Sequence, residues 1–234
     1  MTKKDFQRPD GRGINETRPI TAKIGVIPNA DGSAMFSTGK TIAVAAVYGP
    51  KKMHPQHSQD PTKGTLRADY TMLSFSVHER IRPGKNRRAQ ELGKVTEWAL
   101  QPAVMLEEYP STVVDVYIDI LQADAGTRCA GINAASLALA HAGIPMKSLI
   151  SSISVGKLDK QLVVDLDKAE EDWEEGEGAT DIATSFTADG RLTHIQLDGT
   201  ISIEQLKEAV KMAQKTTAEI YEIQKQTLKT GEYK

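Results

Sequence analysis

The chain has 234 residues, of which 39% are hydrophobic, so it can bury one substantial core and its length requires no second domain. Its 29 Lys and Arg nearly balance its 31 Asp and Glu, and this net charge of -2 excludes binding of polyanions through an overall positive field. Its single cysteine excludes an internal disulfide, and no apolar run reaches the ~18 residues of a membrane helix or resembles a signal peptide, so we expect a cytoplasmic protein without a membrane segment.

The first half of the chain is predicted to be rich in strands. Residues 1–18 are polar, with one proline and two glycines, and predict an extended N-terminal arm. From Ala89 the apolar residues recur at helical spacing, and Pro102 limits the length of that helix. Before this helix, apolar residues alternate with polar ones or run continuously in four predicted strands, at residues 20–27, 33–39, 41–49 and 68–77.

The second half predicts an alanine-rich helix, a hairpin and a long final helix. Residues 114–120 have the clearest strand pattern, because Val and Ile alternate with Asp and Tyr. The alanine-rich helix follows and ends at Gly143, and an amphipathic helix closes the chain at 203–229. Together these elements predict a single α+β domain, residues 1–234, with helices packed on a mixed sheet. The remaining predicted strands are 151–158, 161–167, 180–188 and 191–199, of which the last two form the hairpin.

The segment ADAGTRCAG, residues 123–131, stands between the clearest strand and the alanine-rich helix. It combines a glycine that lets backbone amides approach a ligand, a threonine hydroxyl, the guanidinium of Arg128 and a helix N-terminus. This combination suits a phosphate group, although it matches neither a Walker A loop nor the GxGxxG pattern. The alternative is a small turn that carries an exposed arginine and binds no ligand.

Five cations lie within nine residues at the start of RIRPGKNRRAQELGKV, residues 80–95. Arg87 and Arg88 immediately precede the predicted helix, so two side-chain charges join the positive end of a helix dipole. This arrangement suits successive phosphodiesters. The alternative is a solvated cationic loop without a ligand.

The acidic stretch of residues 170–177 is predicted to belong to a flexible loop, which Asp172 and Asp181 flank. A carboxylate beside a phosphate site can protonate a leaving oxygen or hold a divalent cation, and both residues are candidates for these roles. Asp181 begins an apolar strand, so we expect the sheet to fix its position. The five histidines show no metal-ligand spacing, which argues against a zinc site.

The motifs RPDGRGINETRPI, VYGPKKMHPQH, NRRAQELGKV, LQADAGTRCAGINAASLALAHAGIPM and TDI together resemble the RNase PH family, and in particular its ring subunits of the exosome type. The resemblance extends from Arg8 to Leu228. It implies the RNase PH fold (ribosomal protein S5 domain 2-like), with a long C-terminal helix. It also implies phosphorolysis, in which inorganic phosphate removes the 3′-terminal nucleotide of single-stranded RNA as a nucleoside diphosphate, and which is reversible as 3′ tailing.

The resemblance assigns roles to individual residues. Asp181 matches the catalytic aspartate, and with Asp172 it would bind Mg²⁺ as well as act in catalysis. The family has an acid six residues before the catalytic aspartate, whereas Asp172 lies nine residues before Asp181 and Glu175 takes the six-residue spacing. The residues matched to phosphate binding are Gly126, Thr127, Arg128 and Arg88, and those matched to RNA binding are Arg87, Arg88, Arg67, Tyr70 and His57.

The resemblance also implies partners. Such subunits alternate with an inactive paralogue in a hexameric ring around an RNA channel, with RNA-binding cap subunits above it. Tyr70 would stack on a base of the RNA, or alternatively pack within the sheet. Two other functions stay open: a non-catalytic ring subunit that guides RNA, and a homohexameric RNase PH that trims tRNA.

Overall fold

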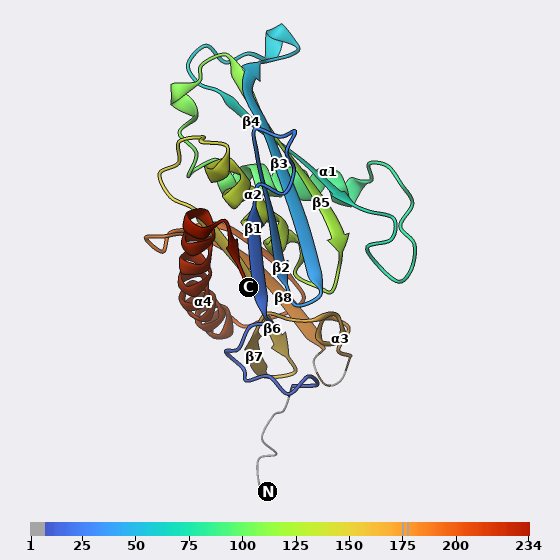
Figure 1. Cartoon of the computed structure of the whole chain (residues 1–234). Coiled ribbons are helices and arrows are strands. Elements are labelled where there is room, and N and C mark those ends of the chain that lie inside the picture. Colours follow the sequence, from blue (N-terminus) through green and yellow to red (C-terminus); the bar gives the residue numbers. More distant parts are fainter. Residues whose placement is uncertain (1–7, 175, 177) are drawn as a thin grey trace, which may run out of the picture.

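The computed structural model describes residues 8–174, 176 and 178–234, whose strands form two sheets (Figure 1). The first sheet has the order β10-β1-β2-β3-β5-β4 and is mixed, because β4 and β5 run parallel while its other neighbouring strands are antiparallel. Its strands are β1 (Ile20–Ile24), β2 (Gly32–Thr38), β3 (Thr41–Lys52), β4 (Thr65–Met72), β5 (Thr112–Gln122) and β10 (Glu232–Tyr233).

The second sheet is antiparallel and has the order β7-β6-β8-β9. The predicted hairpin is present in it as β8 and β9. The later strands thus form a sheet of their own instead of extending the mixed one. The strands of this second sheet are β6 (Ile150–Leu158), β7 (Gln161–Val164), β8 (Ala179–Thr187) and β9 (Leu192–Asp198).

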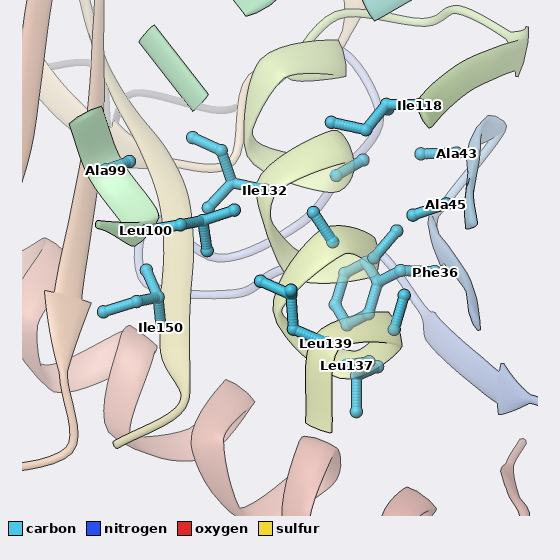
Figure 2. Packing of buried hydrophobic residues seen from close by; sticks show 14 of the residues in the cluster. Phe36, Ala43, Ala45, Ala99, Leu100, Ile118, Ile132, Leu137, Leu139 and Ile150 are labelled. Carbon is cyan, nitrogen blue, oxygen red and sulfur yellow. The ribbon is translucent and has the colours of Figure 1, made fainter. Parts of the chain in front are cut away.

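The helix α2 lies between the two sheets and is buried on almost all sides, which fits its predominantly apolar sequence. Figure 2 shows it at the centre of the core, with Phe36 and Ala45 on one side and Leu100 and Ile150 on the other. Its small residues permit this close approach. The helices are α1 (Arg87–Leu100), α2 (Thr127–His141), α3 (Lys168–Glu171) and α4 (Ile203–Thr230), with the short 3₁₀ helices η1 (Gln56–Ser58) and η2 (Leu106–Glu108).

Several boundaries differ from the predicted ones for local reasons. α1 begins at Arg87, two residues earlier than predicted, because the side chain of Asn86 caps it by accepting a hydrogen bond from the amide of Ala89. The short helix α3 lies where a loop was predicted, and Asp167 begins it with a capping box. None of the helices in the described part of the chain combines the length and the apolar character needed to cross a bilayer.

The predicted N-terminal arm is anchored to the second sheet from Arg8 onward, and its residues 1–7 lie outside the described residues. Arg8 donates from Nε and Nη2 to the two carboxylate oxygens of Glu170, both at 2.7 Å, and both side chains are fully buried. Arg8 also donates to the carbonyl oxygens of Val164 and Asp165, at 2.9 Å and 2.8 Å. These contacts connect the start of the chain to α3.

Candidate active site

A cavity of about 430 Å³ lies where the first turns of α1 and α2 meet strands β6 and β8. Its lining combines side chains from distant parts of the sequence. Arg88 and Arg128 come from the first turns of α1 and α2, and the carboxyl groups of Glu171 and Asp181 come from α3 and β8. Five of the predicted site residues line it, namely Arg88, Gly126, Thr127, Arg128 and Asp181. The fold therefore brings the predicted phosphate loop and the predicted catalytic aspartate to one place.

The predicted phosphate loop, residues 123–126, turns sharply between β5 and α2. Ala125 and Gly126 both have left-handed backbone conformations, with φ of 58° and 64°. Gly126 is the N-cap residue of α2, and within the described part of the chain no side chain caps this helix end. The amides of its first turn are therefore available to an anion, which the helix dipole also favours.

The side chains of Arg18 and Thr41 hold the predicted phosphate loop in place. Arg18 binds Asp165 through Nε (2.9 Å) and Nη2 (2.7 Å), and its Nη1 donates to the carbonyl oxygen of Asp124. Thr41 accepts a hydrogen bond from the amide of Asp124 at 2.9 Å and donates to the carbonyl oxygen of Ala125 at 2.7 Å. The loop is thus fixed by buried polar contacts before any ligand binds.

Asp181 has a pKa suited to proton transfer near neutral pH. Burial raises the pKa of its carboxyl to about 6, and the negative charges of Glu171 and Asp198 act in the same direction, while the cations Arg128 and Arg88 oppose them. Its Oδ1 is buried and has no hydrogen-bond partner among the described residues. A carboxyl in this state can serve as a general acid.

Besides Asp181, two further acids line the cavity, Glu171 and Glu79, neither of which the sequence analysis singled out. Asp172 is the C-cap residue of α3, its side chain is 62% exposed, and it does not line the cavity. Lys168 pairs with both neighbouring acids, with Asp172 at 2.7 Å and with Glu171 at 3.1 Å. The structure thus departs from the prediction that Asp172 joins Asp181. Glu175, the other candidate, lies outside the described residues.

Two comparisons with protein families cover most of the chain. Residues 16–145 match domain 1 of the 3′ exoribonuclease family, RNase PH, and residues 148–216 match its domain 2. The chain is a member of the RNase PH family. This membership confirms the resemblance that the sequence motifs indicated.

Relatives and solved structures extend this finding. The exosome complex component Rrp41 of Pyrococcus furiosus is 48% identical over 223 residues, which are 95% of this chain and 88% of that protein. Rrp41 of Methanopyrus kandleri is 43% identical over 98% of this chain and 95% of its own length. Rice (Oryza sativa) Rrp46 shares the fold with a TM-score of 0.82 at 26% identity, over 94% of this chain and 100% of the rice chain. A chain from an Archaeoglobus fulgidus exosome with RNA bound to the active site shares the fold at a TM-score of 0.81 and 22% identity, over 93% and 92% of the two chains.

The residues predicted to bind RNA in this RNase PH chain are spread along the molecule. Arg87 is exposed in the first turn of α1, beside Arg88. Arg67 lies outside the cavity, and its guanidinium pairs with Asp115 at 2.7 Å. His57 is exposed on η1, the short light-blue helix at the end of the molecule opposite α3 in Figure 1. An RNA that touches all of them has to run along the length of the molecule.

Tyr70 occupies the packing position that was the alternative to its predicted stacking role. It is 1% exposed, and its ring lies against Gly131, where an added Cβ would come within 3.3 Å of it. Burial raises the pKa of its hydroxyl to about 12. Because base stacking needs an exposed ring face, this structure favours core packing for Tyr70.

The acids of the cavity are compatible with one Mg²⁺ ion whose remaining ligands come from the substrate and water. Within the described residues, no group of three or more His, Cys, Asp or Glu side chains is placed to hold a metal. Asp181 and Glu171 both line the cavity, however, and protein-bound Mg²⁺ commonly uses one or two carboxylates together with phosphate oxygens and water. This pair fits such a site, whereas Asp172 does not line the cavity.

Proposed function

We propose that this chain is the catalytic subunit of an exosome-type ring, a phosphate-dependent 3′-to-5′ exoribonuclease that releases nucleoside diphosphates from single-stranded RNA. The observation that carries the proposal is one cavity that combines an uncapped helix N-terminus with a buried carboxyl of pKa about 6. Its similarity to archaeal proteins named Rrp41, an exosome complex component, supports the same assignment.

Inorganic phosphate is the proposed attacking group. Its oxygens would accept hydrogen bonds from the first amides of α2, from Thr127 and from the guanidinium of Arg128, with Arg88 adding a second cation. The neighbouring Arg18 and Thr41 keep the loop in place. A small monovalent or divalent anion would thus be held by groups that need little rearrangement on binding.

The chemical step is a displacement at phosphorus. An oxygen of the bound phosphate attacks the last phosphodiester of the RNA, the bond between phosphorus and the 3′ oxygen breaks, and the terminal nucleotide leaves as a nucleoside 5′-diphosphate. Asp181 gives its proton to the departing 3′ oxygen, and the shortened RNA keeps a free 3′ hydroxyl. In the reverse direction the same carboxylate accepts that proton, and the RNA gains one nucleotide.

RNA and Mg²⁺ complete the proposed site. Arg87 and Arg88 would bind the backbone next to the 3′ end, and Arg67 and His57 would contact RNA farther from it. Asp181 and Glu171 would hold Mg²⁺. When bound, the ion would neutralise charge on the phosphate oxygens. A hexameric ring with an inactive paralogue and RNA-binding caps would supply the remainder of the channel.

The two alternative functions have less support. A ring subunit that only guides RNA needs neither a proton donor nor a phosphate-binding site, yet this cavity contains Asp181 and Arg128 together. A tRNA-trimming homohexamer would use the same chemistry. The similarity to proteins named Rrp41 over 95% of the chain favours the exosome type instead.

The proposal is tested by incubating labelled single-stranded RNA with the chain, alone and with its paralogue, in the presence and absence of inorganic phosphate. We expect nucleoside diphosphates that appear only with phosphate. Nucleoside monophosphates, formed by hydrolysis, would contradict phosphorolysis.

The matched variant is Asp181→Asn, which keeps the size of the side chain but cannot donate a carboxyl proton. We expect turnover to fall by roughly 10²- to 10⁴-fold, the usual contribution of general acid catalysis, while RNA binding in a filter assay stays close to wild type. Diphosphate release at the wild-type rate would eliminate Asp181 as the acid.

A further inference from the structure

Ser154 carries a buried hydroxyl that the structure leaves without a partner. It lies on β6 and is 2% exposed, and within the described part of the chain its Oγ makes no hydrogen bond. Buried hydroxyls are nearly always hydrogen-bonded, because an unsatisfied one costs free energy. We therefore expect the hydroxyl of Ser154 to form its hydrogen bond with a bound ligand.

The neighbouring hydroxyls on β6 show that the strand can satisfy such groups. Ser151 bonds to Gln224 at 2.9 Å, and Ser152 donates to the carbonyl oxygen of Thr184 at 2.7 Å. Ser152 also accepts a hydrogen bond from Ser185 at 3.0 Å. Ser154 is different because its register partner on β8 is Ala183, which offers no polar side chain.

The hydroxyl of Ser154 faces the phosphate loop. A Cβ added at Gly126 would lie 3.3 Å from Arg18 Nη2 and 3.9 Å from Ser154 Oγ, so the hydroxyl lies close to the N-cap of α2. Ser154 lines this cavity together with Thr127 and Asp181. On the sheet, Ser154 and Asp181 share one face, because Ser154 pairs with Ala183 and Asp181 lies two residues before Ala183.

We infer that Ser154 is a further ligand of the inorganic phosphate and that its hydroxyl donates a hydrogen bond to one phosphate oxygen. A hydroxyl is a suitable donor for an anionic oxygen, and such charge-assisted bonds are short and strong. The phosphate would thus be bound by the loop at the start of α2 and also by strand β6 of the second sheet. The inference rests on the proposed phosphorolytic function.

The experiment compares Ser154→Ala with Ser152→Ala, two substitutions that each delete one buried hydroxyl from the same strand. Phosphate is varied at saturating RNA, and equilibrium binding of inorganic phosphate is measured by calorimetry on the same proteins. For Ser154→Ala we expect KM and Kd for phosphate to rise roughly tenfold, the effect of one hydrogen bond to a charged acceptor, with little change in kcat. Ser152→Ala should leave both constants near wild type.

Thermal unfolding without phosphate supplies a second signature. Ser154→Ala should melt at or slightly above the wild-type temperature, because it removes an unsatisfied hydroxyl, whereas Ser152→Ala should melt lower because it breaks two hydrogen bonds. Ser154→Thr, which retains a hydroxyl, should recover phosphate affinity. A purely structural role for Ser154 would reverse this pattern of melting temperatures.

The possible outcomes separate the inference from the proposed function. If wild-type turnover depends on phosphate and Ser154→Ala leaves KM and Kd unchanged, the inference is overturned and the proposed function stands. If wild-type turnover does not depend on phosphate, phosphorolysis fails. In that case a tenfold weaker Kd of Ser154→Ala still supports the ligand role, and a wild-type protein that binds no phosphate overturns it.

Discussion

Two helices begin beside the cavity with arginine in their first turn, and they begin in different ways. At α1 the side chain of Asn86 accepts from the amide of Ala89 at 2.7 Å, and both Arg87 and Arg88 are exposed. At α2 the N-cap is a left-handed Gly126 without a side-chain cap. One helix start therefore satisfies an amide internally and presents exposed charges, while the other leaves its amides without a side-chain cap.

This difference fits two kinds of phosphate. An RNA backbone changes its position from one nucleotide to the next, and long solvated side chains can follow it at low cost. A free phosphate ion has to sit at one point for in-line attack, which favours amides fixed by Arg18 and Thr41. We therefore expect α1 to determine RNA affinity and α2 to determine phosphate affinity.

The strongest test of this division is a pair of substitutions, Arg128→Ala and Arg87→Ala. Arg128→Ala should raise the KM for phosphate roughly 100-fold or more, because it removes a charge-assisted contact to the attacking anion. Arg87→Ala should weaken RNA binding only several-fold and lower the salt dependence of that binding by ~0.7 in log–log slope, the value for one single-strand phosphate contact. Steady-state kinetics with each substrate varied, and binding at several salt concentrations, measure both.

The division would fail if both variants changed the same constant. A rise in the KM for phosphate with Arg87→Ala, equal to that with Arg128→Ala, would show that the two helix starts act on one ligand. Circular dichroism of both variants controls for loss of folding.

The pH dependence of the two reaction directions gives the next largest effect. Because Asp181 is the proposed acid of RNA degradation, kcat should fall as pH rises above about 6, by up to tenfold per pH unit as the carboxyl loses its proton. In the tailing direction the same group acts as a base, so that rate should rise with pH through the same range. Initial rates from pH 5 to 8 in both directions check this, and parallel profiles would contradict the role of Asp181.

Glu171 and Asp172 are neighbours with different expected effects. Glu171→Gln removes a negative charge that raises the pKa of Asp181, so the degradation profile should move to lower pH and the rate at pH 7 should fall several-fold. Asp172→Asn breaks an exposed ion pair with Lys168, and such pairs contribute ~0–1 kcal/mol, so the rate should stay within about twofold. The reverse ranking of the two variants would restore Asp172 as the second acid.

The positions of the loop between β5 and α2 and of the strand that carries Asp181 could be predicted from the sequence, because both depend on local patterns. A strand that alternates clearly, followed by glycine and an alanine-rich helix, fixes where the loop must be. Asp181 stands at the start of an apolar strand, and the sheet then sets its position. That the loop and Asp181 line the same cavity depends on the tertiary structure and could not be read from these local patterns.

The sequence was insufficient where the answer depends on direction in space. The resemblance pointed to Asp172 and the six-residue spacing to Glu175, but the acid that lines the cavity from α3 is Glu171. One residue along a helix rotates a side chain by ~100°, so Glu171 and its neighbour Asp172 point in different directions. The capping box that begins at Asp167 was a signal for α3. Ser154 could not be found at all, because only its pairing with Ala183 leaves its hydroxyl without a partner.

The smallest expected effect concerns the cap that distinguishes α1 from α2. Asn86→Ala removes the side chain that satisfies the amide of Ala89, so the free energy of unfolding should drop by about 1 kcal/mol, the usual cost of losing an N-cap. The first turn then frays and Arg87 loses its fixed start, so RNA affinity should weaken about twofold, while the KM for phosphate stays unchanged. Urea denaturation and the two substrate titrations measure these quantities.

Asn86→Asp is the matched control, since it keeps the acceptor and adds a charge favoured at a helix N-terminus, and it should be at least as stable as wild type. A shift in the KM for phosphate with Asn86→Ala would mean that the start of α1 also shapes the anion seat of α2.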